Sequence, residues 1–257
     1  MDRFCGFEVV AHRGAMGYAP ENTLVSFQKA LDMSATMIEL DVHLTKDREI
    51  VVVHDCDLVR TTNGRGLVED MTLAEIKALD AGIAMGPEFK GEKVPTLQEA
   101  MELIDHRAAV NIELKTGRTL YPDIVDKVLE VIYAYDAEKE VVISSFHKAY
   151  LREVRRKARD IELAVLFERP EPDIFAEAVR EGWQGLHPWY RLVDENFMGE
   201  ARRWGLAVRP WTVNRESEML ELLRAGVTGI ITNFPDLLNS VVTQFSAESP
   251  SSGPSPN

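Results

Sequence analysis

Short runs rich in β-branched residues alternate with longer amphipathic segments along most of the chain, and this alternation limits the folds that it can adopt. The strand-like runs number eight: Glu8–His12, Met37–His43, Ala109–Lys115, Val141–Ser145, Glu162–Phe167, Gly185–His187, Leu206–Thr212 and Gly229–Thr232. Helix-like segments separate most of them: Thr23–Ser34, Leu97–Asp105, Tyr121–Tyr135, Lys148–Arg159, Asp173–Glu181, Asp194–Trp204, Ser217–Arg224 and Pro235–Thr243. Alternating strands and helices predict a parallel sheet, and eight units in roughly 250 residues fit an α/β protein of the (β/α)8 (TIM) barrel type. The competing fold is an open, doubly wound sheet, but no GxGxxG motif follows the first strand.

One region after the second predicted strand departs from this pattern. Residues Ile50–Asp55 form an extra strand-like run that a polar turn joins to the second strand, as in a hairpin. Residues 57–95 then make a connection too long for an ordinary barrel loop, so we expect a small insertion that acts as a lid or subdomain. We predict a single domain over residues 1–245 and a disordered tail over residues 246–257, where Ser and Pro dominate.

Composition narrows the class of protein further. The 257 residues are 45% hydrophobic, which is enough for a large buried core, and the net charge is −13. An acidic surface repels nucleic acid except at a local basic patch, but a small phosphorylated molecule can still be held by a metal ion and buried cations. The two cysteines, Cys5 and Cys56, are too few for a disulfide framework, so we expect thiols, with a single Cys5–Cys56 disulfide as the alternative. The first residues lack the apolar stretch of a signal peptide, and no 18 apolar residues run together, so we expect a cytoplasmic protein without a membrane span.

Ionisable side chains gather where the predicted strands end, which is where barrels of this type carry their active sites. Glu39 and Asp41 share one face of the second strand because side chains alternate along a strand, and Glu113 lies on the third strand. Three carboxylates that face the barrel interior would repel one another and be costly to desolvate. A bound cation resolves this, and oxygen ligands favour Mg²⁺ or Ca²⁺ over zinc. A structural network in which each carboxylate pairs with Arg or Lys is the alternative.

The same strand ends supply candidates for proton transfer and for binding an anion. His12 and His54 are the candidate acid and base, because imidazole titrates near neutral pH. Arg13 and Lys115 are suited to hold phosphate oxygens. Three further residues are weaker candidates for substrate contact: His43, His187 and Trp211, the last of which forms either an apolar wall or part of the core. Glu21 and Asn22 either order the rim of the site or merely begin a helix.

Taken together, these motifs resemble the glycerophosphodiester phosphodiesterase family. The resemblance rests on His12-Arg13-Gly14, Pro20-Glu21-Asn22-Thr23, Glu39-x-Asp41, Leu44-Thr45-Lys46-Asp47, His54-Asp55, Thr61-Thr62-Asn63-Gly64, Pro95-Thr96-Leu97 and Glu113-x-Lys115. It continues more weakly through Ser144-Ser145-Phe146 and Trp211-Thr212-Val213-Asn214 to Thr232-Asn233-Phe234-Pro235. Each motif is weak alone, but their order and spacing from Val9 to about Val242 are specific.

The resemblance implies a catalytic barrel with a small insertion after the second strand, which matches residues 57–95. It also implies metal-dependent hydrolysis of glycerophosphodiesters, such as glycerophosphocholine, to sn-glycerol 3-phosphate and an alcohol. The implied acid–base pair is His12 and His54, the metal ligands are the three carboxylates, and Arg13 and Lys115 bind phosphate. A related diesterase that cuts lysophospholipids or phosphoinositides, and a barrel that binds phosphate esters without turnover, are the alternatives. The order of the two histidines, the choice between Mg²⁺ and Ca²⁺ and the oligomeric state stay open.

Overall fold

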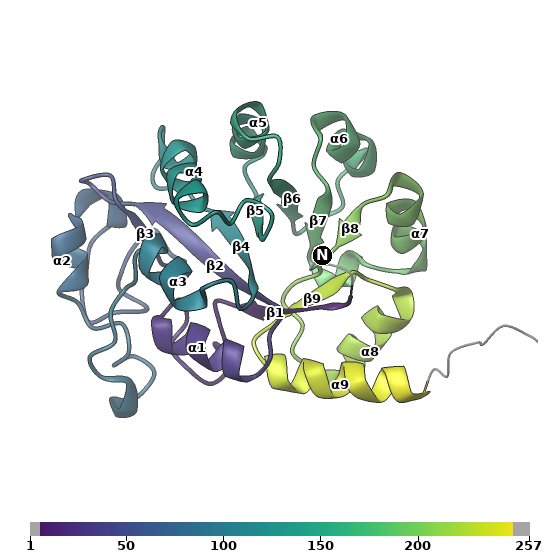
Figure 1. The fold of residues 1–257 in the computed structure, drawn as a ribbon, viewed down its shortest axis with the longest axis horizontal. Helices are drawn as coiled ribbons and strands as arrows, with labels where there is room; N and C mark the ends of the chain where they lie inside the picture. The colour runs from purple at the N-terminus through teal and green to yellow at the C-terminus, as the bar shows by residue number, and fades with distance from the viewer. Residues whose placement is uncertain (1–5, 249–257) are drawn as a thin grey trace, which may run out of the picture.

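Eight parallel strands form a nearly closed barrel in the computed structural model, which describes residues 6–248 (Figure 1). The strands lie side by side in the order β8-β7-β6-β5-β4-β2-β1-β9, and β3 pairs antiparallel with β2 outside this path. Their bounds are β1 Glu8–His12, β2 Met37–Leu44, β3 Ile50–Val52, β4 Ala109–Leu114, β5 Val141–Ser145, β6 Glu162–Phe167, β7 Gly185–Pro188, β8 Ala207–Val208 and β9 Gly229–Thr232. The predicted barrel and the predicted hairpin of β2 with β3 are both confirmed.

Helices ring the strands, as Figure 1 shows, and bury their apolar faces against them. Helix α3 illustrates why they form where they do: Thr96 caps its first turn, Glu99 completes a capping box, and Leu97 and Ile104 are buried. The helices that alternate with the strands are α1 Leu24–Asp32, α3 Leu97–Ile104, α4 Ile124–Ala134, α5 Lys148–Lys157, α6 Ile174–Glu181, α7 Glu195–Trp204, α8 Glu216–Ala225 and α9 Pro235–Glu248.

Helix α9 corrects the predicted start of the C-terminal tail. It runs five residues past the predicted helix end at Thr243, so residues 246–248 are helical and not disordered. The rest of the predicted tail, residues 249–257, and Cys5 lie outside the described residues. Cys56 forms no disulfide within residues 6–248, and its side chain is exposed.

The last seam of the barrel, between β8 and β9, is irregular because of a proline. The predicted strand Leu206–Thr212 is too long, since β8 covers only Ala207–Val208, and Pro210 has no N–H to donate to a ladder. Backbone hydrogen bonds still join the two sides: Thr228 N–H donates to Val208 O, and Ile231 N–H donates to Pro210 O, both over 3.0 Å. The barrel is therefore held together across this seam.

The insertion between β3 and α3 forms a small unit with its own core. It contains two short 3-10 helices, Val68–Asp70 and Pro87–Phe89, and helix α2 Leu73–Lys77, which Figure 1 shows at the left edge of the molecule. Its core is one cluster of buried apolar side chains, which begins in β3 and continues through the insertion: Val51, Val53, Leu58, Val68, Ile76, Ala81 and Val94. The insertion is therefore anchored to β3, directly beside the segment that carries His54.

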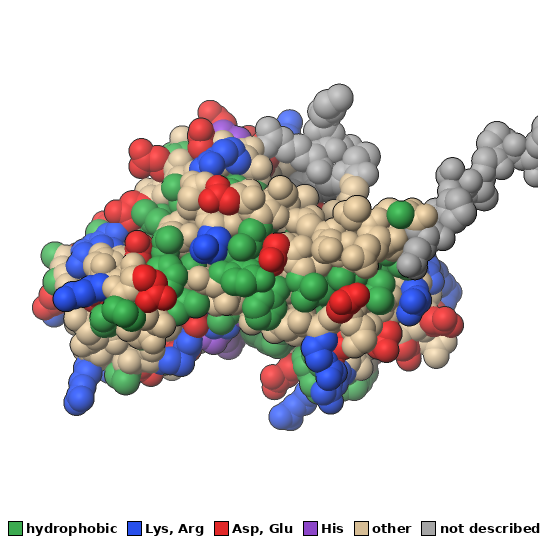
Figure 2. All heavy atoms as spheres, turned by 90° about the horizontal axis from the view of Figure 1, so that it is seen from below, with side chains coloured by type: hydrophobic (Ala, Val, Ile, Leu, Met, Phe, Trp, Pro, Cys, Tyr) green, Lys and Arg blue, Asp and Glu red, His purple; other side chains and the backbone are tan. Residues whose placement is uncertain are grey.

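Below the polar strand ends, a small apolar cluster lies in the interior of the barrel, contributed by six strands: Val10, Met37, Ala109, Val142, Ala164 and Ile231. At the start of β1 and β6, Glu8 and Glu162 form ion pairs with the buried Arg209. Polar side chains follow higher up, toward the C-terminal strand ends. On the outside, the face seen in Figure 2 carries acidic, basic and hydrophobic side chains interspersed, so the excess of negative charge is not gathered there. None of the helices between residues 6 and 248 has the length and apolar character that crossing a membrane requires.

Candidate active site

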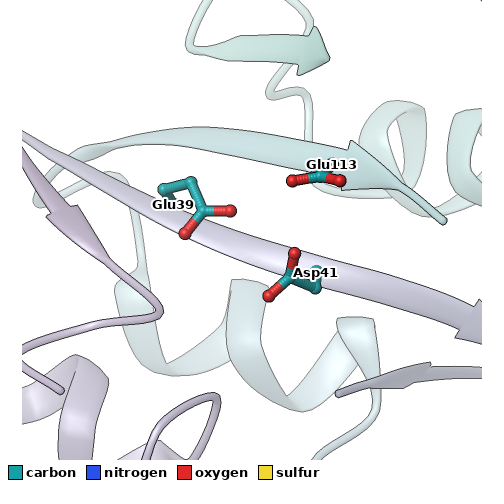
Figure 3. A group of neighbouring side chains, drawn as sticks. All are labelled: Glu39, Asp41 and Glu113. Atoms are coloured by element: carbon teal, nitrogen blue, oxygen red, sulfur yellow. The ribbon is translucent and has the colours of Figure 1, made fainter. Parts of the chain in front are cut away.

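Three buried carboxylates meet at the C-terminal end of the barrel. Asp41 on β2 is the register partner of Glu113 on β4, and Glu39 lies two residues before Asp41 on the same face of β2. Figure 3 shows the three carboxylate groups turned toward one another, and each offers an oxygen within 4.8 Å of the others. This is the arrangement that strand parity predicts for these positions.

Two cations and an amide surround Asp41 in particular. Lys115 Nζ lies 3.1 Å from Asp41 Oδ1 and 2.6 Å from Glu113 Oε1. Arg13 Nε lies 3.2 Å from Asp41 Oδ2, and the backbone N–H of Arg13 donates to Glu39 Oε2 over 2.8 Å. The Asn22 side chain donates to Asp41 Oδ2 over 2.8 Å, so this residue belongs to the site as well as to the loop before α1.

The pKa values of the three carboxyl groups are shifted in different directions, and this difference fits a cation site. Burial raises the pKa of Glu39 well above its ordinary value, and the charges of Asp41 and Glu113 add to the effect. Burial likewise raises the pKa of Glu113 to about 7. Burial alone would also raise the pKa of Asp41, but Lys115 and Arg13 hold it below its ordinary value. The protein's own cations therefore compensate Asp41 far better than Glu39, and a divalent cation with oxygen ligands would compensate all three.

His12, at the end of β1, is held in one tautomer. Its Nδ1 lies 2.7 Å from Asn233 Oδ1, and an amide oxygen can only accept, so Nδ1 carries the proton and donates. Burial lowers the pKa of His12 to about 4, with Arg13 adding to the shift. At neutral pH the ring is therefore uncharged, and Nε2 keeps a lone pair that can take up a proton.

His54 follows β3 and has an acidic partner. Its Nδ1 lies 2.7 Å from Asp55 Oδ1, and since a carboxylate accepts, Nδ1 again carries the proton. Burial lowers the pKa of His54, while Asp41 and Asp55 act in the opposite direction by stabilising the charged ring. His54 thus differs from His12 in having a carboxylate partner that favours the imidazolium form.

A cavity of about 510 Å³ opens over this cluster. Its polar lining includes His54, Glu113 and Lys115, and Phe146, which follows β5, contributes an apolar surface. Trp211 meets the Phe146 ring edge to face, with 5.5 Å between ring centroids, and its indole N–H donates to His187 O over 2.7 Å. The predicted substrate-binding residue Trp211 therefore stands behind the aromatic side of the cavity.

Two other histidines that the sequence offered as substrate contacts have different surroundings. Both ring nitrogens of His43 are engaged by the protein: Nδ1 with the Tyr121 hydroxyl over 2.9 Å and Nε2 with the His54 carbonyl oxygen over 3.1 Å. His187 is fully buried, and neither ring nitrogen finds a hydrogen-bond partner within residues 6–248. His43 lines the cavity, but the protein already engages both of its ring nitrogens. His187 is buried and is not part of the cavity lining within residues 6–248.

The structure gives a role to two residues for which the sequence analysis predicted none, although Asn233 is part of the motif Thr232-Asn233-Phe234-Pro235. Asn233 follows β9 and orients His12, and Arg60, in the insertion, contacts Asp55. A polar residue at a strand end was a usable signal for Asn233. No local pattern distinguished Arg60 from the other basic residues of the insertion.

Comparison with known proteins agrees with this geometry. The glycerophosphoryl diester phosphodiesterase family matches residues 12–237. A glycerophosphodiester phosphodiesterase of Caldanaerobacter subterraneus subsp. tengcongensis is 43% identical and is aligned over 91% of this chain and 97% of its own length. One from Bacillus subtilis is 38% identical, over 90% and 85%. The structure of an Oleispira antarctica phosphodiesterase in complex with the product sn-glycerol-3-phosphate superimposes with a TM-score of 0.87 at 31% identity and covers 91% of this chain and 96% of its own. The chain therefore belongs to the glycerophosphoryl diester phosphodiesterase family of hydrolases.

Proposed function

We propose that this enzyme cleaves glycerophosphodiesters with small polar alcohols, such as glycerophosphocholine and glycerophosphoethanolamine, to sn-glycerol 3-phosphate and the free alcohol. The observation that carries the proposal is the convergence of three carboxylates, two cations and two differently partnered histidines at the C-terminal end of the barrel. The small-molecule product named for the Oleispira antarctica relative supports the same substrate class.

In this proposal Glu39, Asp41 and Glu113 hold one divalent cation, Mg²⁺ or Ca²⁺. A cation bound there supplies charge neutralisation at the phosphate and lowers the pKa of a nearby hydroxyl. Arg13 and Lys115 bind the phosphate oxygens, and their present contacts with the carboxylates support this because both cations already lie at the cluster. Phe146 and Trp211 form the apolar side against which the alcohol rests.

The two histidines divide the proton transfers according to their partners. His12 acts as the base, because its amide partner and its burial favour the neutral ring. It removes the proton from the attacking hydroxyl group, whose oxygen forms a bond to phosphorus. The bond from phosphorus to the alcohol oxygen breaks, and His54 donates a proton to that oxygen, supported by Asp55. Water and the glycerol 2-hydroxyl are both suitable nucleophiles. Attack by the 2-hydroxyl gives a cyclic phosphate, which ³¹P NMR would detect; water must then attack its phosphorus and break the bond to the 2-oxygen, which takes up a proton, to give sn-glycerol 3-phosphate.

The experiment that tests the function measures release of sn-glycerol 3-phosphate from glycerophosphocholine with Mg²⁺, with Ca²⁺ and with excess chelator. We expect turnover with a divalent cation and none in chelator. Full activity in chelator would contradict the metal site. Lysophosphatidylcholine serves as the comparison substrate, and preferential cleavage of it would favour the lipid-cleaving alternative. Tight binding of sn-glycerol 3-phosphate without any turnover would favour the non-catalytic one.

A further inference from the structure

One guanidinium group from the insertion joins two carboxylates that come from other segments. Arg60 Nε lies 2.6 Å from Asp55 Oδ2. Its Nη1 and Nη2 lie 2.6 and 2.9 Å from the two carboxylate oxygens of Glu21, in the loop between β1 and α1. Arg60 therefore binds Glu21 in the bidentate manner and reaches Asp55 with a third N–H, a geometry that only a guanidinium offers.

Each of these carboxylates also holds a side chain of the active site. Asp55 Oδ1 accepts from His54 Nδ1 over 2.7 Å, and Glu21 Oε1 accepts from Arg13 Nη1 over 2.8 Å. A continuous series of hydrogen-bonded groups therefore leads from the proposed acid, His54, through Arg60 to the proposed phosphate-binding residue, Arg13.

Arg60 also keeps both carboxylates charged. Burial alone would raise the pKa of Asp55, but hydrogen bonds from Arg60 and His54 lower it to about 2. Arg60 and Arg13 hold the pKa of Glu21 below its ordinary value against the same effect of burial. Both carboxylates are therefore charged hydrogen-bond acceptors at neutral pH.

The backbone that carries Arg60 is fixed by the insertion. Leu58 is fully buried in the insertion's own core, and Thr62 donates both its N–H (3.1 Å) and its hydroxyl (2.6 Å) to the Leu58 carbonyl oxygen. The Arg60 side chain is about half exposed, yet its guanidinium is engaged on both sides. Where that guanidinium lies is thus decided by the fold of the insertion.

We propose that Arg60 is a positioning residue, which orients His54 through Asp55 and Arg13 through Glu21, and that the insertion thereby completes the active site. The proposal rests on the function proposed above. It differs from the ordinary expectation for an exposed ion pair, whose loss changes little.

The test compares Arg60→Gln and Arg60→Lys with a matched control, Arg152→Gln. Arg152 is also a half-exposed guanidinium between two carboxylates, 3.1 Å from both Glu177 and Glu181, but it lies on α5, on the outside of the barrel. With glycerophosphocholine and saturating metal, we expect Arg60→Gln to lower kcat/KM by about 10–100-fold, as is usual when a partner of an active-site group is lost. Arg60→Lys keeps the positive charge but cannot bind Glu21 in the bidentate manner, so its kcat/KM should lie between those of Arg60→Gln and the wild type. Arg152→Gln should leave kcat and KM unchanged.

Two further measurements separate positioning from a general loss of structure. In an Asp55→Asn background, Arg60→Gln should have little further effect on kcat but should still raise KM through Glu21 and Arg13. Calorimetric binding of sn-glycerol 3-phosphate with metal present should be weaker in Arg60→Gln than in Arg152→Gln, and this readout does not need turnover. Weaker binding in Arg60→Gln would support the role of Arg60 even if the wild-type protein bound the product without hydrolysing the diester. Equal kinetics and equal binding in Arg60→Gln and Arg152→Gln would overturn it. A wild-type protein that neither binds nor turns over would overturn both proposals.

Discussion

Asp41 and Glu113 are register partners on neighbouring strands, and one ammonium group touches both carboxylates. Lys115 Nζ lies 3.1 Å from the first and 2.6 Å from the second. Its side chain is only 13% exposed, so it is a nearly buried cation between two buried anions. The interaction matters because removal of one member of a buried ionic group leaves the rest uncompensated.

Lys115→Met should therefore destabilise the metal-free protein. We expect a loss of about 3–5 kcal/mol in the free energy of unfolding, the usual effect of breaking a buried ion pair. Urea unfolding in excess chelator measures it, and added Mg²⁺ or Ca²⁺ should recover part of the loss by compensating the carboxylates. The exposed pair of Lys127 and Glu130 on α4 provides the control, since Lys127→Met should change stability by less than about 1 kcal/mol. An unchanged midpoint for Lys115→Met in chelator would show that the carboxylates do not need the ammonium group.

Glu113→Gln should become relatively more stable than the wild type as the pH rises, when metal is absent. The folded state raises the pKa of Glu113 from 4.5 to about 7, so folding favours its protonated form. The stability that this group contributes is complete below about 4.5 and is lost as the pH rises through about 7. Gln does not titrate, so the difference between variant and wild type should grow over this range, by on the order of 3 kcal/mol at most. Parallel stability curves in chelator from pH 4.5 to 7.5 would contradict the raised pKa.

Asn233→Asp should move the acidic limb of the pH–rate profile to higher pH. In the wild type, burial lowers the pKa of His12 to about 4, and the partner of its Nδ1–H is a neutral amide. A carboxylate at this position would stabilise the charged ring and raise the His12 pKa by about one to three units. A base must be unprotonated to act, so kcat/KM should fall near neutral pH and recover at higher pH. If activity persists and the limb does not move, His12 is not the base.

The strands that place the site could be predicted from the sequence because burial imposes a simple pattern on them. The runs of β1, β5, β6 and β9 have the predicted bounds, and parity along β2 and β4 brought the three carboxylates to one face. The short β8 could not be foreseen from its apolar run alone, because Pro210 interrupts the ladder within it. The predicted division into domains and the cytoplasmic location stay predictions.

The partner of His12 and the contacts of Arg60 could be predicted less well than the strands, because they depend on contacts between distant segments. Asn233 lies 221 positions from His12, and Glu21 lies 39 positions from Arg60. The alternation of side chains between the two faces of one strand carries no information about such pairs. They follow from how the loops after different strands fold over the barrel, and only the structure supplies that.

His43 provides a last prediction, because its contacts assign it to His54 and not to substrate. Its Nε2 lies 3.1 Å from the His54 carbonyl oxygen, which only accepts, so Nε2 carries the proton and Nδ1 accepts from the Tyr121 hydroxyl. His43→Leu removes the donor to His54 and should lower kcat by about tenfold or more while KM changes little, because Arg13 and Lys115 are untouched. His43→Gln, whose amide nitrogen can reach the same carbonyl, should restore most of kcat. Tyr121→Phe is the complementary variant: it leaves Nε2–H in place and should reduce kcat less than His43→Leu does. A rise in KM for His43→Leu, without rescue by Gln, would instead mean that His43 contacts the substrate.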